Sequence, residues 1–168
     1  MAGASALLSA CAVQAMGPQP LRLARLEAEG FALGPVRPGP GAVAKAADGH
    51  FWAEADVSAG EPDLQAHSHK VRFLVDTGAT AVALTPQDAA RLGLRPQDLH
   101  YGQDVTTAGG SARAANVTLA AISIDGARLE NVQALVVSDG LDVSLLGMSY
   151  LGRLTRFEAT RTTLRFQP

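Results

Sequence analysis

Short apolar runs separated by turn residues dominate the chain from residue 50 to its end. Residues 51–57 alternate loosely between apolar and polar side chains, and residues 71–75 form a dense apolar run that is typical of a buried strand. The same reasoning predicts further strands at 81–85, 105–107, 112–117, 119–124, 129–137, 143–146, 154–157 and 163–166. Many short strands, with a turn signal about every eight to twelve residues, indicate an all-β barrel or sandwich.

Turn and capping residues join these strands into hairpins and mark two short helices. Residues 108–111 (Ala-Gly-Gly-Ser) predict a hairpin with a flexible tip, and residues 125–126 (Asp-Gly) predict a second hairpin. Thr85 precedes a proline and therefore suits the N-cap of a helix that Gly93 ends. Residues 147–151 predict another short helix, so helices are a minor part of the expected fold.

The chain ahead of residue 50 lacks this strand pattern. Residues 17–49 are rich in proline and glycine and show poor apolar periodicity, which indicates a tether. Residues 1–16 are small and apolar and include no charged side chain. We therefore expect a lipoprotein or signal segment at 1–16, a tether at 17–49 and a folded domain at 50–168.

The apolar N-terminal segment has three interpretations. Residues 8–11 resemble a bacterial lipobox, in which Cys11 becomes lipidated, and residues 12–15 alternatively fit a small-residue cleavage site, although no positive charge precedes the run. The third interpretation is a disordered or truncated N-terminus. The run is too short for a transmembrane helix, which needs ~20 apolar residues. Export would place the domain in the periplasm or tether it to a membrane of the cell envelope; without export it would be cytoplasmic.

Composition and charge narrow the classes of function. The chain has 168 residues, of which 47% are hydrophobic and 18% charged, with a formal net charge of −2. This balance shows no global attraction to nucleic acid or to an anionic membrane. Cys11 is the single cysteine, so the chain has no intrachain disulfide and no cysteine-based metal cluster. The fold therefore depends on packing.

A carboxylate follows the strand predicted at 71–75. Residues 73–80 read Phe-Leu-Val-Asp-Thr-Gly-Ala-Thr, so Asp76 ends a buried strand and Gly78 permits a tight turn two residues later. The carboxylate is thereby placed at the mouth of the hydrophobic core. A bare Asp-Thr-Gly tripeptide is also compatible with an ordinary turn at the end of a strand, so its context decides its meaning.

That context resembles the retropepsin type of aspartic protease. One signature of the family is an apolar run followed by Asp-Thr-Gly-Ala, which residues 75–79 match. A second is a downstream apolar pair followed by glycine and a short helix, which residues 145–151 match. The resemblance implies a closed β-barrel, the acid-protease half, with one or two short helices. It also implies that Leu145, Leu146 and Gly147 cross the catalytic turn and pack against it.

The resemblance covers about residues 50–166 and implies roles for further residues. The hairpin between the two signatures takes the place of the flap that closes over substrate, and its tip comprises Ala108, Gly109, Gly110 and Ser111. In the catalytic turn, Thr77 is expected to bond across a twofold axis and Gly78 to contact the substrate backbone. Ala79 and Thr80 complete the turn, and Ala79 stands where pepsins usually carry a hydroxyl residue.

A single Asp-Thr-Gly turn implies a homodimer. Two-lobed pepsins have two such turns, whereas the Asp-Gly pairs at 48–49, 125–126 and 139–140 of this chain lack the intervening hydroxyl residue. Peptide hydrolysis by this chemistry needs two carboxylates that hold one water and share one proton, and aspartic proteases are the established example. We therefore expect Asp76 and its twofold mate to form one active site.

The sequence thus predicts an aspartic endopeptidase that cleaves peptide or protein substrates, in particular envelope proteins, without a metal or cofactor. One alternative is a non-catalytic peptide-binding or dimerisation module with the same fold, which would have no need of the intact turn at Asp76. Another is a metal-dependent hydrolase with His67 and His69 as ligands. No third ligand accompanies these two histidines, and an exposed loop is the commoner role for such a segment.

Overall fold

The structure is a computed structural model that describes residues 41–60 and 68–168, all within one structural unit. The N-terminal segment predicted at 1–16, with Cys11, lies outside the described residues. So do His67 and the greater part of the predicted tether.

Strands β2 (Trp52–Ser58) and β3 (His69–Val75) form an antiparallel pair at the start of the barrel. The side chains of Ala53, Ala55 and Val57 are fully buried, and the residues between them are more exposed. Successive side chains of a strand point to opposite faces, so this alternation gives β2 one face in the core and one toward solvent. The strand pattern at 51–57 is confirmed.

Strands β5 (Gln103–Thr107), β6 (Gly110–Ile124) and β7 (Ala127–Val137) form two consecutive hairpins. The sequence predicted two strands where β6 is one continuous strand. At the second turn Asp125 and Gly126 have φ values of 46° and 91°. Positive φ at both central residues is characteristic of a type I′ turn, which follows the twist of the two strands, and it confirms the hairpin predicted there.

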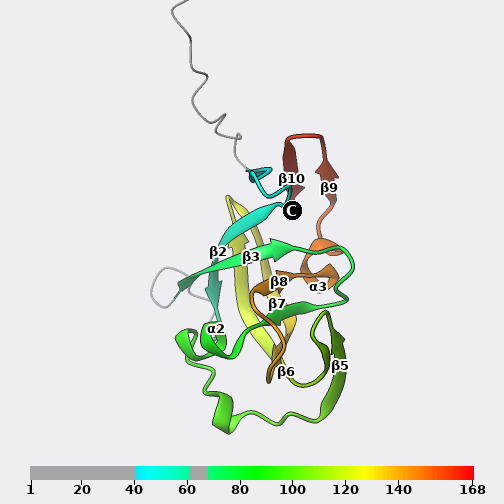
Figure 1. The fold of residues 1–168 in the computed structure, drawn as a ribbon. Helices are drawn as coiled ribbons and strands as arrows, with labels where there is room; N and C mark the ends of the chain where they lie inside the picture. Colours follow the sequence, from blue (N-terminus) through cyan, green and yellow to red (C-terminus); the bar gives the residue numbers. More distant parts are fainter. Residues whose placement is uncertain (1–40, 61–67) are drawn as a thin grey trace, which may run out of the picture. The chain divides into compact units, whose positions relative to one another are not determined.

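The main sheet closes into a barrel because β6 pairs with β2 as well as with β7 (Figure 1). The strand order is β2-β3-β8-β4-β7-β6-β5, and β8 (Ser144–Leu146) lies between β3 and β4 (Val82–Leu84). Among the described strands β5 pairs with β6 alone, and it lies outside the closed ring of six strands. The predicted all-β barrel is confirmed.

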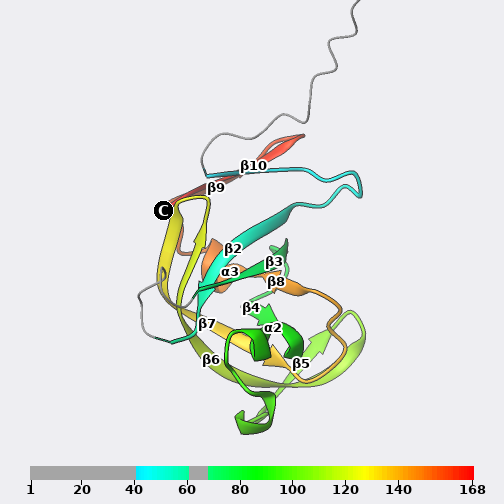
Figure 2. The same cartoon turned by 90° about the vertical axis from the view of Figure 1, so that its left-hand side faces the viewer.

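A second sheet, in the order β1-β10-β9, combines both ends of the described chain (Figure 2). Its strands are β1 (Ala42–Ala44), β9 (Arg156–Ala159) and β10 (Thr163–Gln167). The predicted boundary of the tether at residue 49 is therefore wrong, because β1 lies within that segment. β1 is held by pairing with β10 and by the Gly41 amide, which donates to Asp125 Oδ2 at 2.7 Å. Contacts between segments so far apart in the sequence cannot be predicted from local composition.

Two short α-helices and one 3-10 turn complete the described part of the fold: α2 (Pro86–Arg91), α3 (Met148–Leu151) and η1 (Pro96–Asp98). Thr85 caps α2, and its Oγ1 accepts from the Asp88 amide at 3.1 Å, as the sequence predicted for an N-cap. Within the described residues, no helix is long and apolar enough to span a membrane.

Tyr150 of α3 is the largest of the fully buried side chains in the barrel core. Its hydroxyl donates to the Ala127 carbonyl oxygen at 2.6 Å, which links α3 to the start of β7. Burial raises the pKa of the Tyr150 phenol far above its ordinary value of 10.0. Helix α3 is therefore attached near the turn of the β6–β7 hairpin, at the other end of β6 from the β5–β6 turn.

Replacing Tyr150 with Phe should lower the free energy of unfolding by about 1–2 kcal/mol at neutral pH, because the buried Ala127 carbonyl loses its donor. The pKa of Tyr150 is raised in the folded state, so the stability that the neutral phenol contributes is complete below about pH 10 and is lost as the pH rises above it. Urea unfolding at pH 8 and at about pH 10.5 measures both effects. The wild type should lose more stability between these pH values than Y150F; an equal loss would contradict the burial of this phenol.

Candidate active site

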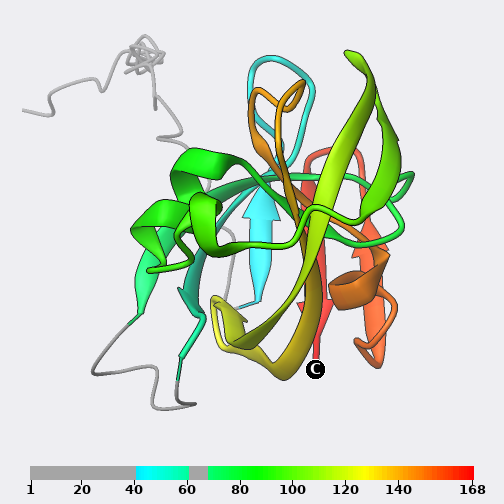
Figure 3. The ribbon, with the colours of Figure 1, turned by 90° about the horizontal axis from the view of Figure 1, so that it is seen from below.

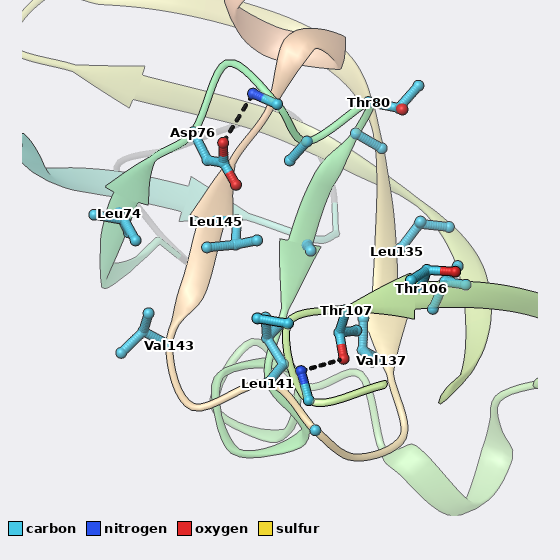
Figure 4. Close-up of a pocket in the computed structure, with 18 of the residues that line it drawn as sticks. Leu74, Asp76, Thr80, Thr106, Thr107, Leu135, Val137, Leu141, Val143 and Leu145 are labelled. Atoms are coloured by element: carbon cyan, nitrogen blue, oxygen red, sulfur yellow. Dashed lines mark hydrogen bonds between the residues drawn. The ribbon is translucent and has the colours of Figure 1, made fainter. Parts of the chain in front are cut away.

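Asp76 ends β3 and begins a tight turn that its own side chain closes. The Asp76 Oδ1 accepts from the Gly78 amide at 2.8 Å, and the Asp76 carbonyl accepts from the Ala79 amide at 3.3 Å. The Asp76 amide donates to the Leu146 carbonyl of β8 at 3.1 Å. The carboxylate is half-buried, whereas Thr77 and Gly78 are exposed. The turn thus fixes the carboxylate through Oδ1. The other carboxylate oxygen points away from the hydrogen bond with the Gly78 amide (Figure 4).

The segment that follows β8 passes through the loop between β3 and β4. β8 runs parallel to β3, with Val75 opposite Leu146, and antiparallel to β4. The next residue, Gly147, lies so close to this loop that an added Cβ would be 2.2 Å from the Ala81 carbonyl oxygen and 2.7 Å from that of Ala79. The Met148 amide donates to the same Ala79 oxygen at 2.8 Å. The structure therefore places Leu145, Leu146 and Gly147 against the turn that holds Asp76.

Ser149 of α3 links the segment after β8 to strands β4 and β7. Its Oγ accepts from the Val82 amide at 2.8 Å and donates to the Gln133 carbonyl at 2.6 Å. One hydroxyl thereby joins α3, β4 and β7 beside the loop between β3 and β4.

A cavity of about 820 Å³ opens in front of Asp76. Its floor is a row of apolar side chains on neighbouring strands, Leu74, Leu145, Ala83 and Leu135, which lie directly opposite one another in the strand register. Residues 140–143 form one wall (Figure 4). Among the described residues that line the cavity, Asp76 and Asp142 carry the only charges. The cavity is mainly apolar, with the Asp76 carboxylate at its edge.

The β5–β6 hairpin forms the remaining wall and projects beyond the barrel (Figure 3). The Thr107 hydroxyl shapes its tip, because it donates to the Gly110 carbonyl at 3.0 Å and accepts from the Gly109 amide at 3.2 Å. The tip lies against the opposite wall: a Cβ added to Gly109 would be 3.3 Å from the Gly140 carbonyl oxygen. At the hairpin base, Arg113 donates twice to the Tyr101 carbonyl, at 3.1 and 2.7 Å.

The residues predicted at the flap tip divide into two groups. Ala108 and Gly109 line the cavity, whereas Gly110 and Ser111 belong to the start of β6 and do not. The sequence reasoning missed Val105, Thr106 and Thr107, which line the cavity from β5. Glycines predict where the turn lies, but they do not predict which of the two strands faces the cavity. That depends on how the whole hairpin packs against the barrel.

The other predicted site residues lie as follows. Gly78, Ala79 and Thr80 line the cavity, and Thr77 does not. His69 is exposed at the start of β3, and its predicted partner His67 lies outside the described residues. In the part of the chain that the structure describes, no group of three His, Cys, Asp or Glu side chains is arranged to hold a metal ion.

The barrel, the crossing beside the Asp76 turn and the hairpin over the cavity together match the arrangement that the two signatures implied. The chain also matches, over residues 63–153, the family described as gag-polyprotein putative aspartyl protease. A crystal structure of a retropepsin-like aspartic protease from Rickettsia conorii is 36% identical, with a TM-score of 0.63, and the similarity covers 76% of this chain and 98% of that one. The chain therefore belongs to the retropepsin-like family of aspartic proteases, which confirms the resemblance found in the sequence.

Two uncharacterised bacterial proteins are similar to the chain as well. One, from Rickettsia prowazekii (strain Madrid E), is 37% identical over 122 residues, which are 73% of this chain and 48% of that protein. The other, encoded in the cobV 5′ region of Sinorhizobium sp, is 40% identical over 124 residues, which are 73% of this chain and 49% of that protein. The chain spans about half the length of these curated relatives.

Proposed function

We propose that the chain is an aspartic endopeptidase that is active as a homodimer. The observation that carries this proposal is the Asp76 carboxylate, which lies at the edge of a mainly apolar cavity and is held by the Gly78 amide. A fixed carboxylate beside an open cavity is a suitable general base for a bound water. A non-catalytic binding module would have no need of this group.

Each protomer supplies one half of the catalytic pair. In the proposed dimer one Asp76 is ionised and removes a proton from the water that attacks the scissile carbonyl carbon. The Asp76 of the second protomer is protonated and donates to the carbonyl oxygen, and a proton then reaches the leaving amine. Since two carboxylates in contact cannot both be ionised, the pair shares one proton and titrates as a unit.

The exposed part of the catalytic turn supports this arrangement. Within the described part of the protomer, the Thr77 hydroxyl has no hydrogen-bond partner, and its side chain is exposed beside the catalytic aspartate. It is therefore available to bond to the second protomer across the twofold axis. Gly78 lines the cavity and leaves its backbone accessible to an extended peptide.

The substrate is proposed to be a peptide or protein segment bound in extended form between the cavity floor and the β5–β6 hairpin. Cleavage of envelope proteins, a location in the periplasm or cell envelope, and a membrane tether at Cys11 remain predictions from the N-terminal sequence. The proposed chemistry uses no metal or cofactor.

Mixing wild-type protein with an equal amount of D76N should lower the rate to about one quarter of that of wild-type protein at the same total concentration, because random pairing leaves about one quarter of dimers with two Asp76 side chains. Peptide cleavage is measured by chromatography after the mixture has exchanged subunits. Sedimentation across the same concentrations measures the dimer directly.

D139N is the control variant for this mixing experiment and replaces D76N in it. Asp139 is an exposed carboxylate that does not line the cavity. Its mixtures should keep the full wild-type rate. A rate that falls to one half with D76N would show that each chain acts independently, and the dimeric mechanism would be wrong.

A further inference from the structure

A buried polar network behind the cavity joins α2 to β8. Ser144 is 1% exposed and Asp88 is 7% exposed, which makes them two of the few buried polar residues of the described chain. The Ser144 hydroxyl accepts from the Thr85 amide at 3.1 Å and donates to Asp88 Oδ2. Asp88 Oδ1 accepts from Arg91, whose side chain is 56% exposed. The polar atoms of this network all have partners.

The network is a modified helix cap of α2 that includes Ser144, a residue from strand β8. In an ordinary capping box, the acidic side chain three residues after the N-cap accepts directly from the N-cap amide. Here Thr85 and Asp88 hold those positions, but the Ser144 hydroxyl lies between the Thr85 amide and the Asp88 carboxylate and bonds to both. A local capping motif has thereby become a tertiary link between α2 and the first residue of β8.

Ser144 lies in the chain between the cavity wall at 140–143 and Leu145 of the cavity floor. The wall at 140–143 ends at Ser144, and its other end is fixed where the Ser138 amide donates to the Arg113 carbonyl at 2.8 Å. In the other direction β8 continues to Leu146, whose carbonyl accepts from the Asp76 amide. The cavity wall is therefore held at both ends. The end at Ser144 is held by the pairing of Ser144 with Phe73 of β3 and by the side-chain link between Asp88 and Ser144.

We propose that Asp88 and Ser144 are positioning residues for peptide binding: the Ser144 hydroxyl, held by Asp88, fixes the wall at 140–143 against the bound substrate. This inference rests on the proposed peptidase function. Neither residue touches substrate in the proposed complex, because both side chains are buried on the α2 side of β8. Their effect reaches the peptide through the wall that they hold.

The S144A variant tests the link. It should raise KM for a peptide substrate by about tenfold and change kcat by less than about twofold, since a mobile wall weakens substrate binding before the chemical step. Amide hydrogen exchange in the same variant, measured without substrate, should become faster at 139–145 while the hairpin turn at 124–127 keeps its wild-type rate. An increase spread evenly over the whole domain, with KM unchanged, would overturn the proposal.

A matched variant separates the hydroxyl link from the ion pair. R91Q removes only the exposed cation beside Asp88, so it should keep KM within about twofold of wild type. If R91Q raises KM as much as S144A does, the ion pair controls the wall and the proposal is wrong. The exchange experiment requires no peptidase activity, so it tests the link even if D76N and wild-type protein prove equally inactive and the proposed function fails.

Discussion

Replacing Asp76 with Asn is expected to lower kcat by at least about a thousandfold, because Asn cannot accept the proton of the attacking water or share a proton with its mate. The side-chain oxygen of Asn can still accept from the Gly78 amide, so the turn and the fold should persist. Incubation of wild-type and D76N protein with a diverse peptide library, followed by mass spectrometry of the products, measures the effect directly.

D139N provides the control for the removal of a carboxylate near the cavity. Asp139 lies in the same loop as Gly140 but does not line the cavity, so D139N should cleave the library at the wild-type rate. Equal cleavage by D76N and wild type would remove Asp76 from the chemistry. If both proteins instead bind peptides tightly and cleave none, the domain is a binding module with the same fold.

Replacing Gly147 with Ala should lower the free energy of unfolding by about 3 kcal/mol or more, because the new methyl group has no room beside the turn that holds Asp76. The added Cβ would lie 2.2 Å from the Ala81 carbonyl oxygen, and backbone atoms cannot move aside as a flexible side chain can. The φ of Gly147 is −96°, which other residues adopt readily, so the effect is steric. Urea unfolding followed by circular dichroism measures it.

Gly60 is the matched control for Gly147. A Cβ added there would meet nothing within 4 Å, so G60A should change stability by less than about 0.5 kcal/mol. If G147A were as stable as G60A, the segment after β8 would not pass through the loop between β3 and β4. The turn would then lack the support from Leu146 and Met148 that holds Asp76 in place.

The sequence by itself determined the strand pattern, the two hairpins, the cap at Thr85 and the candidate catalytic residue. These features depend on neighbouring residues: the side-chain alternation of β2, the positive φ values at 125–126 and the Asp-Thr-Gly turn are all encoded within a few positions. Local steric and hydrogen-bonding preferences are sufficient to produce them, so they can be read before the fold is known.

Only the tertiary structure decided how these parts meet. The inclusion of β1 in the domain, the cavity face of β5 and the Ser144 hydroxyl inside the α2 cap each depend on segments that are distant in sequence. So does the row of apolar side chains under Asp76, whose members come from four different strands. Strand register and chain crossing create these contacts, and no local preference of the residues involved specifies which distant partner each will have.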